Sequence, residues 1–216
     1  MPFSSDQTLA TLLHYPVVPV YYHADPAQAQ AVVRACYDGG IRAFEFVNRG
    51  ANALAVFKQL QEYVRHECPS LTLGIGTIYT AEEATQFILA GADFVVQPVT
   101  TPAVGALCRE QNIPWLPGAL TPNEIHQASQ LGAAVVKIFP GNLVGPDYIK
   151  ALRGPMPHLK LMVTGGVEPT IASLSDWLGA GVNAVGMGSQ LFKDADPAAI
   201  TARVAPLMHY VSTLAR

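Results

Sequence analysis

The residue of this chain with the clearest chemical potential is Lys137, which lies in the apolar run 134–140 (AVVKIFP). Only five lysines occur in 216 residues, and Lys58, Lys150 and Lys193 lie in polar or helical surroundings. A lysine inside a buried strand loses hydration, which disfavours its charged form. A neutral amine can then attack a ketone and form a Schiff base. The structural alternative, a lysine whose head reaches water or an acidic partner, is the one that this strand favours when taken alone.

A second ionisable residue, Glu45, lies in another apolar run, 43–48 (AFEFVN). Successive side chains of a strand point to opposite faces. Phe44 and Phe46 share one face and are suited to packing on helices, which leaves Glu45 on the other. A carboxylate beside a Schiff base can move the protons of imine and enamine chemistry. Two buried opposite charges need each other or a chemical role.

The elements that must position these residues alternate along the chain. Short apolar runs predict strands, and longer amphipathic segments between them predict helices. The expected strands are 17–22, 43–48, 71–77, 94–98, 114–120, 135–140, 160–165 and 184–189. The expected helices are 26–38, 51–67, 81–90, 102–111, 122–131, 146–153, 169–179 and 196–214. Capping residues, three of them followed by proline, precede several helices at Asp25, Thr80, Thr101 and Thr121, and glycines mark several helix ends at 39–40, 91, 132 and 179.

Eight such strand–helix units predict a single (β/α)8 barrel, the TIM-barrel fold, over residues 1–216. The rival architecture is an open doubly wound sheet, but the glycine-rich dinucleotide fingerprint after the first strand is missing from the sequence. Pro19 and Pro117 fall inside strand runs and lack the amide of a sheet ladder, so we expect a bulge or break at each. Glu45 and Lys137 should both point into the barrel.

Active sites of such barrels form at the C-terminal ends of the strands. Polar residues and glycines gather there in this chain, and each of them taken singly could be structural. Arg49 lies four residues beyond Glu45, about 13 Å at full strand extension, and should sit at the rim and bind a carboxylate with its guanidinium fork. The ends of the seventh and eighth strands, Thr164-Gly165-Gly166 and Gly188-Ser189, are where barrels often bind phosphate. Together they describe a 2-keto acid with a phosphate at its far end.

Composition narrows the class of partner. Hydrophobic residues make up 50% of the chain and charged residues 13%, with a formal net charge of −3 and no lysine or arginine cluster, which argues against nucleic acid and against an anionic membrane. Three widely spaced cysteines and six histidines show no disulfide or metal-ligand pattern. We expect a cytoplasmic protein, because the chain has neither a secretory signal nor a long apolar span.

The order of these motifs resembles the bacterial 2-keto-3-deoxy-6-phosphogluconate / 4-hydroxy-2-oxoglutarate aldolase family, class I Schiff-base aldolases on a small barrel. The resemblance covers essentially the whole chain. It rests on residues 17–20 (VVPV), 39–45 (GGIRAFE) with Arg49, 74–77 (GIGT), 97–98 (QP), 113–118 (IPWLPG), 136–140 (VKIFP), 163–166 (VTGG) and 186–189 (GMGS).

The resemblance implies a role for each site residue and requires neither a metal nor another cofactor. Lys137 would form the imine and Glu45 would carry protons. Arg49 and Thr77 would hold the carboxylate, and Pro98 and Phe139 would shape the pocket. Thr164 would lie beside the reacting carbons, and the phosphate would bind at Gly165, Gly166, Gly188 and Ser189. The resemblance also implies a homotrimer.

Several positions depart from the family pattern: Val47, Gln97, Val99, Gly141-Asn142 and Gln190. None belongs to the Schiff-base set, but they affect the distal and hydroxyl-recognising region of the site. The substrate therefore stays open among the phosphogluconate derivative, its galactonate epimer and hydroxy-oxoglutarate. Two alternatives remain. The first is a phosphosugar-binding barrel enzyme without Schiff-base chemistry, such as an isomerase or a transferase. The second is a non-catalytic keto-acid-binding protein.

Overall fold

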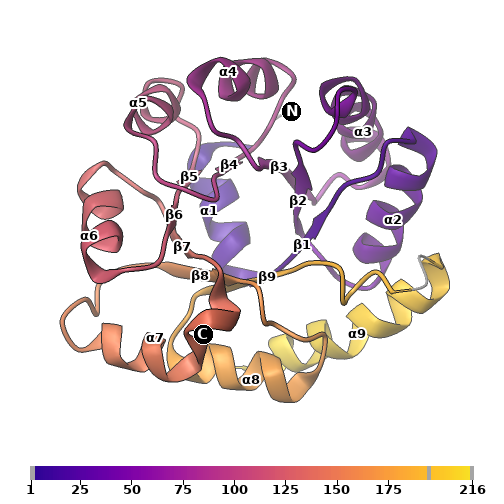
Figure 1. The fold of residues 1–216 in the computed structure, drawn as a ribbon. Coiled ribbons are helices and arrows are strands. Elements are labelled where there is room, and N and C mark those ends of the chain that lie inside the picture. Colours follow the sequence, from indigo (N-terminus) through magenta and orange to yellow (C-terminus); the bar gives the residue numbers. More distant parts are fainter. Residues whose placement is uncertain (1–2, 194–195, 215–216) are drawn as a thin grey trace.

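The computed structural model describes residues 3–193 and 196–214, which form a ring of parallel strands surrounded by helices (Figure 1). The strands are β1 (Val17–Tyr21), β2 (Ala43–Val47), β3 (Thr72–Gly76), β4 (Val95–Val96), β5 (Trp115–Leu116), β6 (Gly118–Ala119), β7 (Val136–Ile138), β8 (Leu161–Thr164) and β9 (Ala184–Met187). The helices of the ring are α2 (Pro26–Asp38), α3 (Ala53–Glu67), α4 (Ala81–Leu89), α5 (Pro102–Glu110), α6 (Pro122–Gln130), α7 (Gly145–Arg153), α8 (Ile171–Ala180) and α9 (Pro197–Thr213).

The sheet closes on itself at Pro117. Its strand order is β5-β4-β3-β2-β1-β9-β8-β7-β6, so its two ends are β5 and β6, which only Pro117 separates in the chain. The amide of Lys137 donates to the Pro117 carbonyl at 2.8 Å, which ties this corner to β7. The two short strands are thus one barrel strand interrupted by proline, and the predicted (β/α)8 barrel is confirmed.

The two strand prolines behave differently. The expected break occurs at Pro117, but the expectation for Pro19 is wrong, because β1 runs unbroken through it and Pro19 lies opposite Met187 of β9. The reason lies in the register of β1. It pairs with β2 only from Val20 onward, so the residue without an amide falls where β1 has a neighbour on one side only.

Most helix boundaries follow the signals in the sequence. Thr80 and Thr121 each form a capping box, and Asp25 accepts a hydrogen bond from the amide of Ala27. Thr101 precedes α5 without a side-chain bond to that helix. The expected stop at Gly179 is wrong: α8 continues to Ala180 and ends at Gly181, whose φ of 107° is the left-handed conformation that glycine adopts readily.

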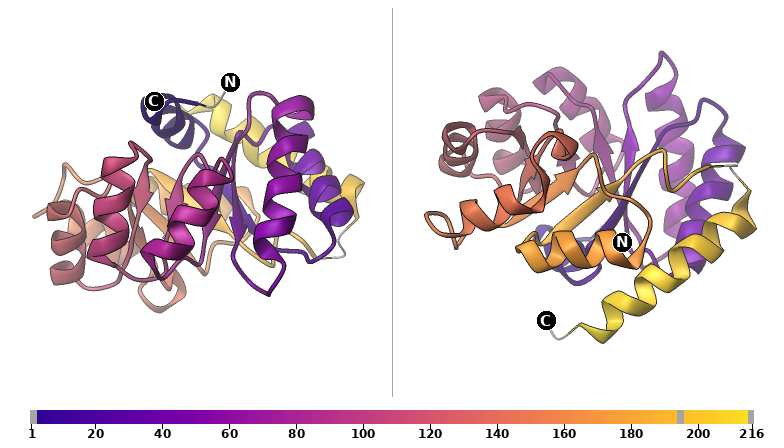
Figure 2. Two further views of the ribbon diagram at one scale, coloured as in Figure 1. Left: turned by 90° about the horizontal axis from the view of Figure 1, so that it is seen from above. Right: turned by 60° about the horizontal axis from the view of Figure 1, so that its bottom comes forward.

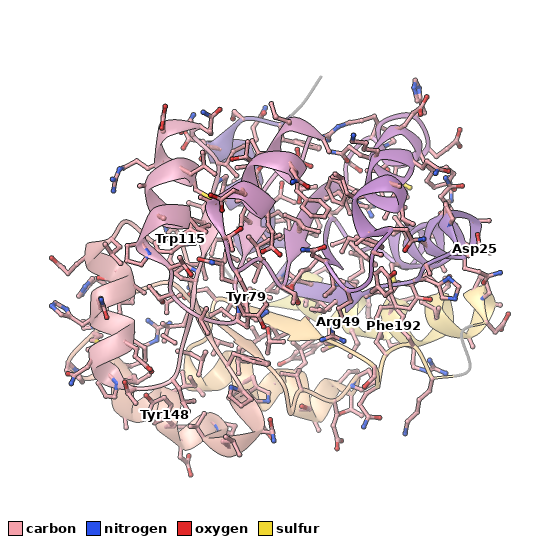
Figure 3. All side chains as sticks on the ribbon, turned by 45° about the horizontal axis from the view of Figure 1, so that its top comes forward. Asp25, Arg49, Tyr79, Trp115, Tyr148 and Phe192 are labelled. Atoms are coloured by element: carbon pink, nitrogen blue, oxygen red, sulfur yellow. The ribbon has the colours of Figure 1, made fainter. Side chains whose placement is uncertain are left out.

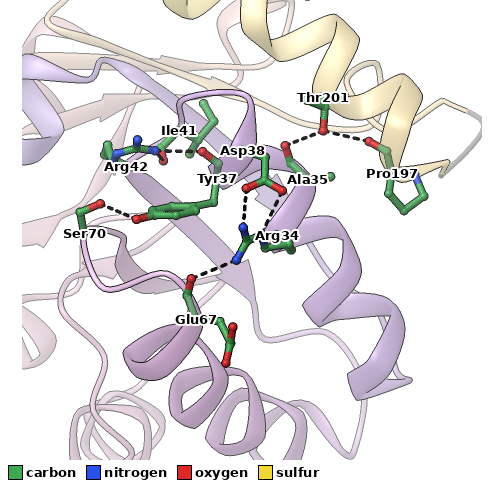
Figure 4. A network of polar contacts seen from close by, with 10 residues as sticks. All are labelled: Arg34, Ala35, Tyr37, Asp38, Ile41, Arg42, Glu67, Ser70, Pro197 and Thr201. Carbon is green, nitrogen blue, oxygen red and sulfur yellow. Dashed lines mark hydrogen bonds and ion pairs between the residues drawn. The ribbon is translucent and has the colours of Figure 1, made fainter.

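Polar contacts fasten α2 to its neighbours on both sides (Figure 4). The hydroxyl of Thr201 in α9 donates to the Ala35 carbonyl at 2.9 Å, and the guanidinium of Arg34 donates to the Glu67 carbonyl at the end of α3 at 3.2 Å. Arg34 also pairs with Asp38 at 2.9 Å, one turn along the same helix. Such exposed pairs contribute little, so the order of α2 rests mainly on its buried face.

The core has two layers. The outer layer lies between sheet and helices and contains Phe44 and Phe46, as expected from strand parity. The inner layer fills the barrel and includes Val135, which has the same parity as Lys137. The other members of the inner layer are Leu12, Val18, Ala43, Phe94, Val96, Leu116, Met162 and Ala184. The end of the barrel where the strands begin is therefore packed with apolar side chains, and the polar residues occupy the end where the strands terminate.

A helix that the alternating pattern did not predict, α1 (Ser5–His14), closes the end of the barrel where the strands begin. Figure 1 shows it behind the strands, and the left view of Figure 2 shows it at one end of the barrel, outside the ring of helices. A capping box between Ser4 and Gln7 starts the helix, and Leu12 packs into the inner layer. In the part of the chain that the structure describes, no helix is both long and apolar enough to span a membrane.

Leu12→Ala should destabilise the protein by about 2–5 kcal/mol, because it opens a cavity at the base of the barrel, where Leu12 is 1% exposed. Urea unfolding followed by circular dichroism measures this free energy. The matched control is Leu89→Ala at an 83% exposed position of α4, where the change should stay within about 0.5 kcal/mol. Equal losses of unfolding free energy at both positions would contradict the role of Leu12 in closing the base of the barrel.

Candidate active site

Lys137 and Glu45 meet inside the barrel, near the C-terminal ends of their strands. Lys137 lies in β7 and Glu45 in β2, 92 positions apart in the chain, and Nζ lies 3.5 Å from Oε1. Lys137 is 5% exposed and Glu45 only 1%. Burying two charges is favourable only when they pair well or when further groups satisfy them. A buried amine and a carboxylate within reach of each other can also exchange protons with a molecule bound between them.

Two buried oxygen atoms beside this pair lack hydrogen-bond partners among the described residues. One is Oε2 of Glu45, and the other is Oγ1 of Thr164 at the end of β8, next to β7 in the sheet. Buried polar groups are normally hydrogen-bonded, and exceptions require an explanation. A bound polar molecule could donate to the carboxylate oxygen, and it could donate to or accept from the hydroxyl.

Glycines on neighbouring strands leave the room that these side chains occupy. A Cβ atom added to Gly76 of β3 would lie 1.9 Å from Oε1 of Glu45, and one added to Gly186 of β9 would lie 2.3 Å from Oγ1 of Thr164. Gly118 lies equally close to the backbone of Pro98, where an added Cβ would be 2.3 Å from the carbonyl group. The sequence analysis treated Gly76 only as part of a motif, and its contact with Glu45 emerges from the fold.

Phe139 borders the amine from the same strand face. Its ring centroid lies 5.4 Å from Nζ of Lys137, within the range of a cation–π contact, and the ring is partly exposed. The ring therefore lies beside the buried amine and is partly open to solvent.

Arg49 and Thr77 lie at the rim. Arg49 is exposed in the loop after β2, as Figure 3 shows, and Thr77 directly follows β3. Among the described residues neither is joined to Lys137 or Glu45 by a hydrogen bond or ion pair. Thr77 has a φ of 60°, which is rare for a β-branched residue and costs about 1–3 kcal/mol. Such strain persists only where the surrounding structure fixes it.

The turn after β8 consists of two glycines that pack closely against another segment of the chain. Gly165 and Gly166 have φ values of 93° and 74°, and both lie against Asn142 in the short helix η1 (Gly141–Leu143). A Cβ atom on Gly166 would lie 2.8 Å from Cα of Asn142, so a side chain does not fit. Gly188 and exposed Ser189 follow β9 in the adjacent turn. The sequence analysis noted Asn142 only as a departure and did not predict its contact with the two glycines.

The other potential nucleophiles of the chain are poorly suited to chemistry. Cys36, Cys68 and Cys108 are buried free thiols. Burial raises the pKa of Cys68 to about 11 and that of Cys108 to about 12, and it raises the pKa of Cys36 further. Thiolates are therefore scarce at neutral pH. Among the described residues, no three His, Cys, Asp or Glu side chains gather as metal ligands.

The fold and the site define a parallel barrel enzyme whose strand ends surround a buried amine and carboxylate. Comparison with known proteins assigns it more closely. The model of the KDPG and KHG aldolase family matches residues 9–202. A 2-dehydro-3-deoxy-phosphogluconate aldolase of Treponema pallidum is 37% identical over 156 residues, covering 70% of this chain and 71% of the relative. The 2-dehydro-3-deoxy-6-phosphogalactonate aldolase of Escherichia coli is 28% identical, covering 82% of this chain and 85% of the relative.

Solved structures agree with this assignment. KDPG aldolase from Legionella pneumophila, with pyruvate captured at low pH as a covalent carbinolamine intermediate, is 25% identical with a TM-score of 0.83, over 93% of this chain and 97% of that one. Thiamine phosphate pyrophosphorylase from Pyrococcus furiosus is 16% identical with a TM-score of 0.72, over 93% of this chain and 98% of that one, and shares the fold alone. The chain belongs to the KDPG and KHG aldolase family, and it is therefore an aldolase, a lyase.

Gly76→Ala should reduce aldolase activity at least about tenfold, because the new methyl group would displace the Glu45 carboxylate from Lys137. Overpacking should also destabilise the fold by about 1–3 kcal/mol. The control is Gly179→Ala in α8, where an added Cβ meets nothing within 4 Å. This change should leave activity intact and stabilise the helix by about 0.5–1 kcal/mol. Activity assays with thermal unfolding measure both effects, and full activity of a folded Gly76→Ala variant would contradict the geometry.

Proposed function

We propose that this protein is a class I aldolase that reversibly cleaves a 2-keto-3-deoxy-6-phospho-aldonate or 4-hydroxy-2-oxoglutarate. The products are pyruvate and an aldehyde, which is glyceraldehyde 3-phosphate or glyoxylate, and the intermediate is a Schiff base on Lys137. The observation that carries this proposal is the buried contact of 3.5 Å between Nζ of Lys137 and Oε1 of Glu45, beside the unpartnered oxygens of Glu45 and Thr164.

The first step joins the substrate to Lys137. The lone pair of neutral Nζ attacks the C2 ketone and gives a carbinolamine, the kind of intermediate that the Legionella pneumophila structure contains. Glu45 in its acid form donates a proton to the carbinolamine hydroxyl, which leaves as water. The protonated imine that remains is a sink for the electrons of the next bond to break.

Cleavage and product release reuse the same two groups. The Glu45 carboxylate, directly or through a water molecule, accepts the proton of the C4 hydroxyl; the C3–C4 bond breaks, and its electron pair moves toward the imine, leaving an enamine and an aldehyde. Glu45, directly or through a water molecule, protonates C3 of the enamine. Water then adds to the imine, pyruvate leaves, and the amine of Lys137 is restored. Thr164 lies beside the reacting carbons, where its unpartnered hydroxyl can hold an oxygen of the substrate.

The remaining site residues bind the two ends of the substrate. Arg49 and Thr77 hold the carboxylate next to C2, between walls formed by Pro98 and Phe139. The backbone amides of Gly165, Gly166 and Gly188, with the hydroxyl of Ser189, hold the distal phosphate. Glycine backbone amides at the ends of the last two barrel strands suit an anion, and the named relatives act on phosphorylated aldonates.

The proposal extends to the location and assembly of the protein. We place it in the cytoplasm as one barrel domain over residues 1–216, assembled as a homotrimer. A structure designed by fusing symmetric oligomeric domains into a protein cage contains a chain with a TM-score of 0.82 to this one, which supports an oligomer. The fold of the Pyrococcus furiosus transferase leaves its class as a second candidate on architecture alone, and the buried Lys137–Glu45 pair favours the aldolase.

Borohydride should trap pyruvate on Lys137. The protein is incubated with pyruvate and reduced, and peptide mapping by mass spectrometry then locates the added group. A reduced pyruvyl adduct is expected on Lys137, the buried lysine with a carboxylate partner, and not on exposed Lys150. Lys137→Met should abolish labelling and turnover, whereas Lys150→Met should change neither. An adduct on another lysine, or none on a folded sample, would refute the proposal.

Glu45→Gln should lower kcat by about 10²–10⁴-fold, because the amide keeps the shape of the side chain but cannot carry protons. The fold should survive, as measured by circular dichroism, since the glutamine fits the space that Gly76 leaves. Trapping of pyruvate should become slower and still reach completion, because Lys137 remains. A kcat within a few-fold of the parent value would remove Glu45 as the proton carrier.

A further inference from the structure

Gln97 is a fully buried polar residue directly after β4, and it lies outside the catalytic set. Its side chain is fully hydrogen-bonded. Nε2 donates to the carbonyl of Ile78 at 3.0 Å and to the hydroxyl of Thr101 at 3.1 Å, and Oε1 accepts from Nε1 of Trp115 at 2.8 Å. Three elements, the turn after β3, the start of α5 and strand β5, thus meet on one amide.

Trp115 fixes the orientation of this amide. The indole N–H can only donate, so the atom that faces it must be the amide oxygen. The NH2 group is therefore directed at Ile78 and Thr101. Glutamine suits the position because it offers one acceptor and two donors in a fixed plane, which neither an acid nor an apolar side chain of the same size offers.

The turn held by Gln97 contains the strained residue Thr77. Ile78 directly follows Thr77, whose φ is 60°. Other bonds hold the turn on both sides of Thr77 and Ile78. The amide of Asn48 donates to the carbonyl of Gly76 at 2.9 Å, Glu83 accepts from the amide of Tyr79 at 2.7 Å, and Thr101 donates to the Tyr79 carbonyl at 3.3 Å. At Ile78 the amide makes a long contact of 3.5 Å with the Val96 carbonyl, so the bond from Gln97 is the shorter restraint there.

We propose that Gln97 is a positioning residue that holds Thr77 in its left-handed conformation, so that the turn is ready to bind the carboxylate of the keto acid. This inference rests on the proposed function, because Thr77 is taken as a carboxylate-binding residue. Strained backbone persists where its surroundings fix it, and a turn fixed before binding loses less entropy when the ligand arrives. The side-chain bonds of Gln97 go to Ile78, Thr101 and Trp115, and that of Lys137 goes to Glu45.

The test is Gln97→Met, which keeps the volume of the side chain and removes its hydrogen bonds. The pyruvate concentration that gives half-maximal borohydride trapping should rise about tenfold, since the net loss of the two bonds that Nε2 donates, out of three in all, corresponds to about that factor. Trapping at saturating pyruvate should stay complete, because Lys137 and Glu45 are untouched. A half-saturation within about twofold of the parent value in a folded variant would overturn the proposal.

Two further variants separate positioning from general stability. Trp115→Phe removes only the bond to Oε1, so it should lower the melting temperature without changing half-saturation more than about twofold. If the half-saturating pyruvate concentration rises equally in Gln97→Met and Trp115→Phe, the network is merely structural and the proposal is wrong. If Gln97→Met fails to fold, Gln97→Glu above neutral pH serves instead, because it keeps the acceptor for Trp115 and lacks the donors, and the same rise is expected.

Thr77→Gly supplies the decisive background, because glycine adopts a φ of 60° without help. Adding Gln97→Met to Thr77→Gly should change half-saturation by less than about twofold beyond the effect of Thr77→Gly alone. If the effects of Gln97→Met and Thr77→Gly on half-saturation are fully additive, Gln97 does not act through Thr77. Failure of the proposed function looks different, since the parent protein itself would then show no adduct on Lys137.

Discussion

The structure is organised around two opposite charges inside one barrel. Lys137 and Glu45 lose nearly all contact with solvent, and a single contact of 3.5 Å between them does not satisfy either group fully. Desolvation of both ions opposes this arrangement unless a ligand or further polar groups complete it. The rest of the barrel interior is consistent with that constraint. The end where the strands begin is apolar and closed by Leu12, so the polar groups are confined to the end where the strands terminate.

Glycines at the strand ends leave room for the pair. Gly76 and Gly186 stand where any larger residue would displace Glu45 or Thr164, and Gly118 stands against the backbone of Pro98. A parallel barrel brings all its strand ends to one rim, so residues far apart in the chain become neighbours there. Small residues beside large functional ones are the packing solution that lets these side chains share a narrow interior.

Much of this arrangement follows from local patterns in the sequence. Strand parity placed Glu45 and Lys137 inside the barrel, with Phe44 and Phe46 on its outer face, because alternation is a property of the strand itself. Helix α1 was not predicted, since it precedes the first strand and breaks the alternating rhythm. Pro19 and Gly179 were misjudged because pairing register and helix length depend on neighbours that no local pattern contains. The contacts of Gln97 with Ile78 and Trp115 join separate strands and are equally invisible in the sequence.

Hydrogen-bond satisfaction distinguishes the two kinds of buried polar residue in this barrel. Gln97 has every side-chain donor and acceptor engaged, so its network is complete without a ligand and fixes the geometry of the protein. Glu45 and Thr164 each keep a buried oxygen without a partner among the described residues, so their environment is complete only when something else is bound. The strained Thr77 directly precedes Ile78, whose carbonyl accepts a hydrogen bond from Gln97. At Glu45, Thr164 and Thr77 a local loss of stability coincides with the proposed chemistry, as expected where function and folding make opposite demands on the same residues. The unpartnered oxygens of Thr8 in α1 and Gln61 in α3 have no such link to the site.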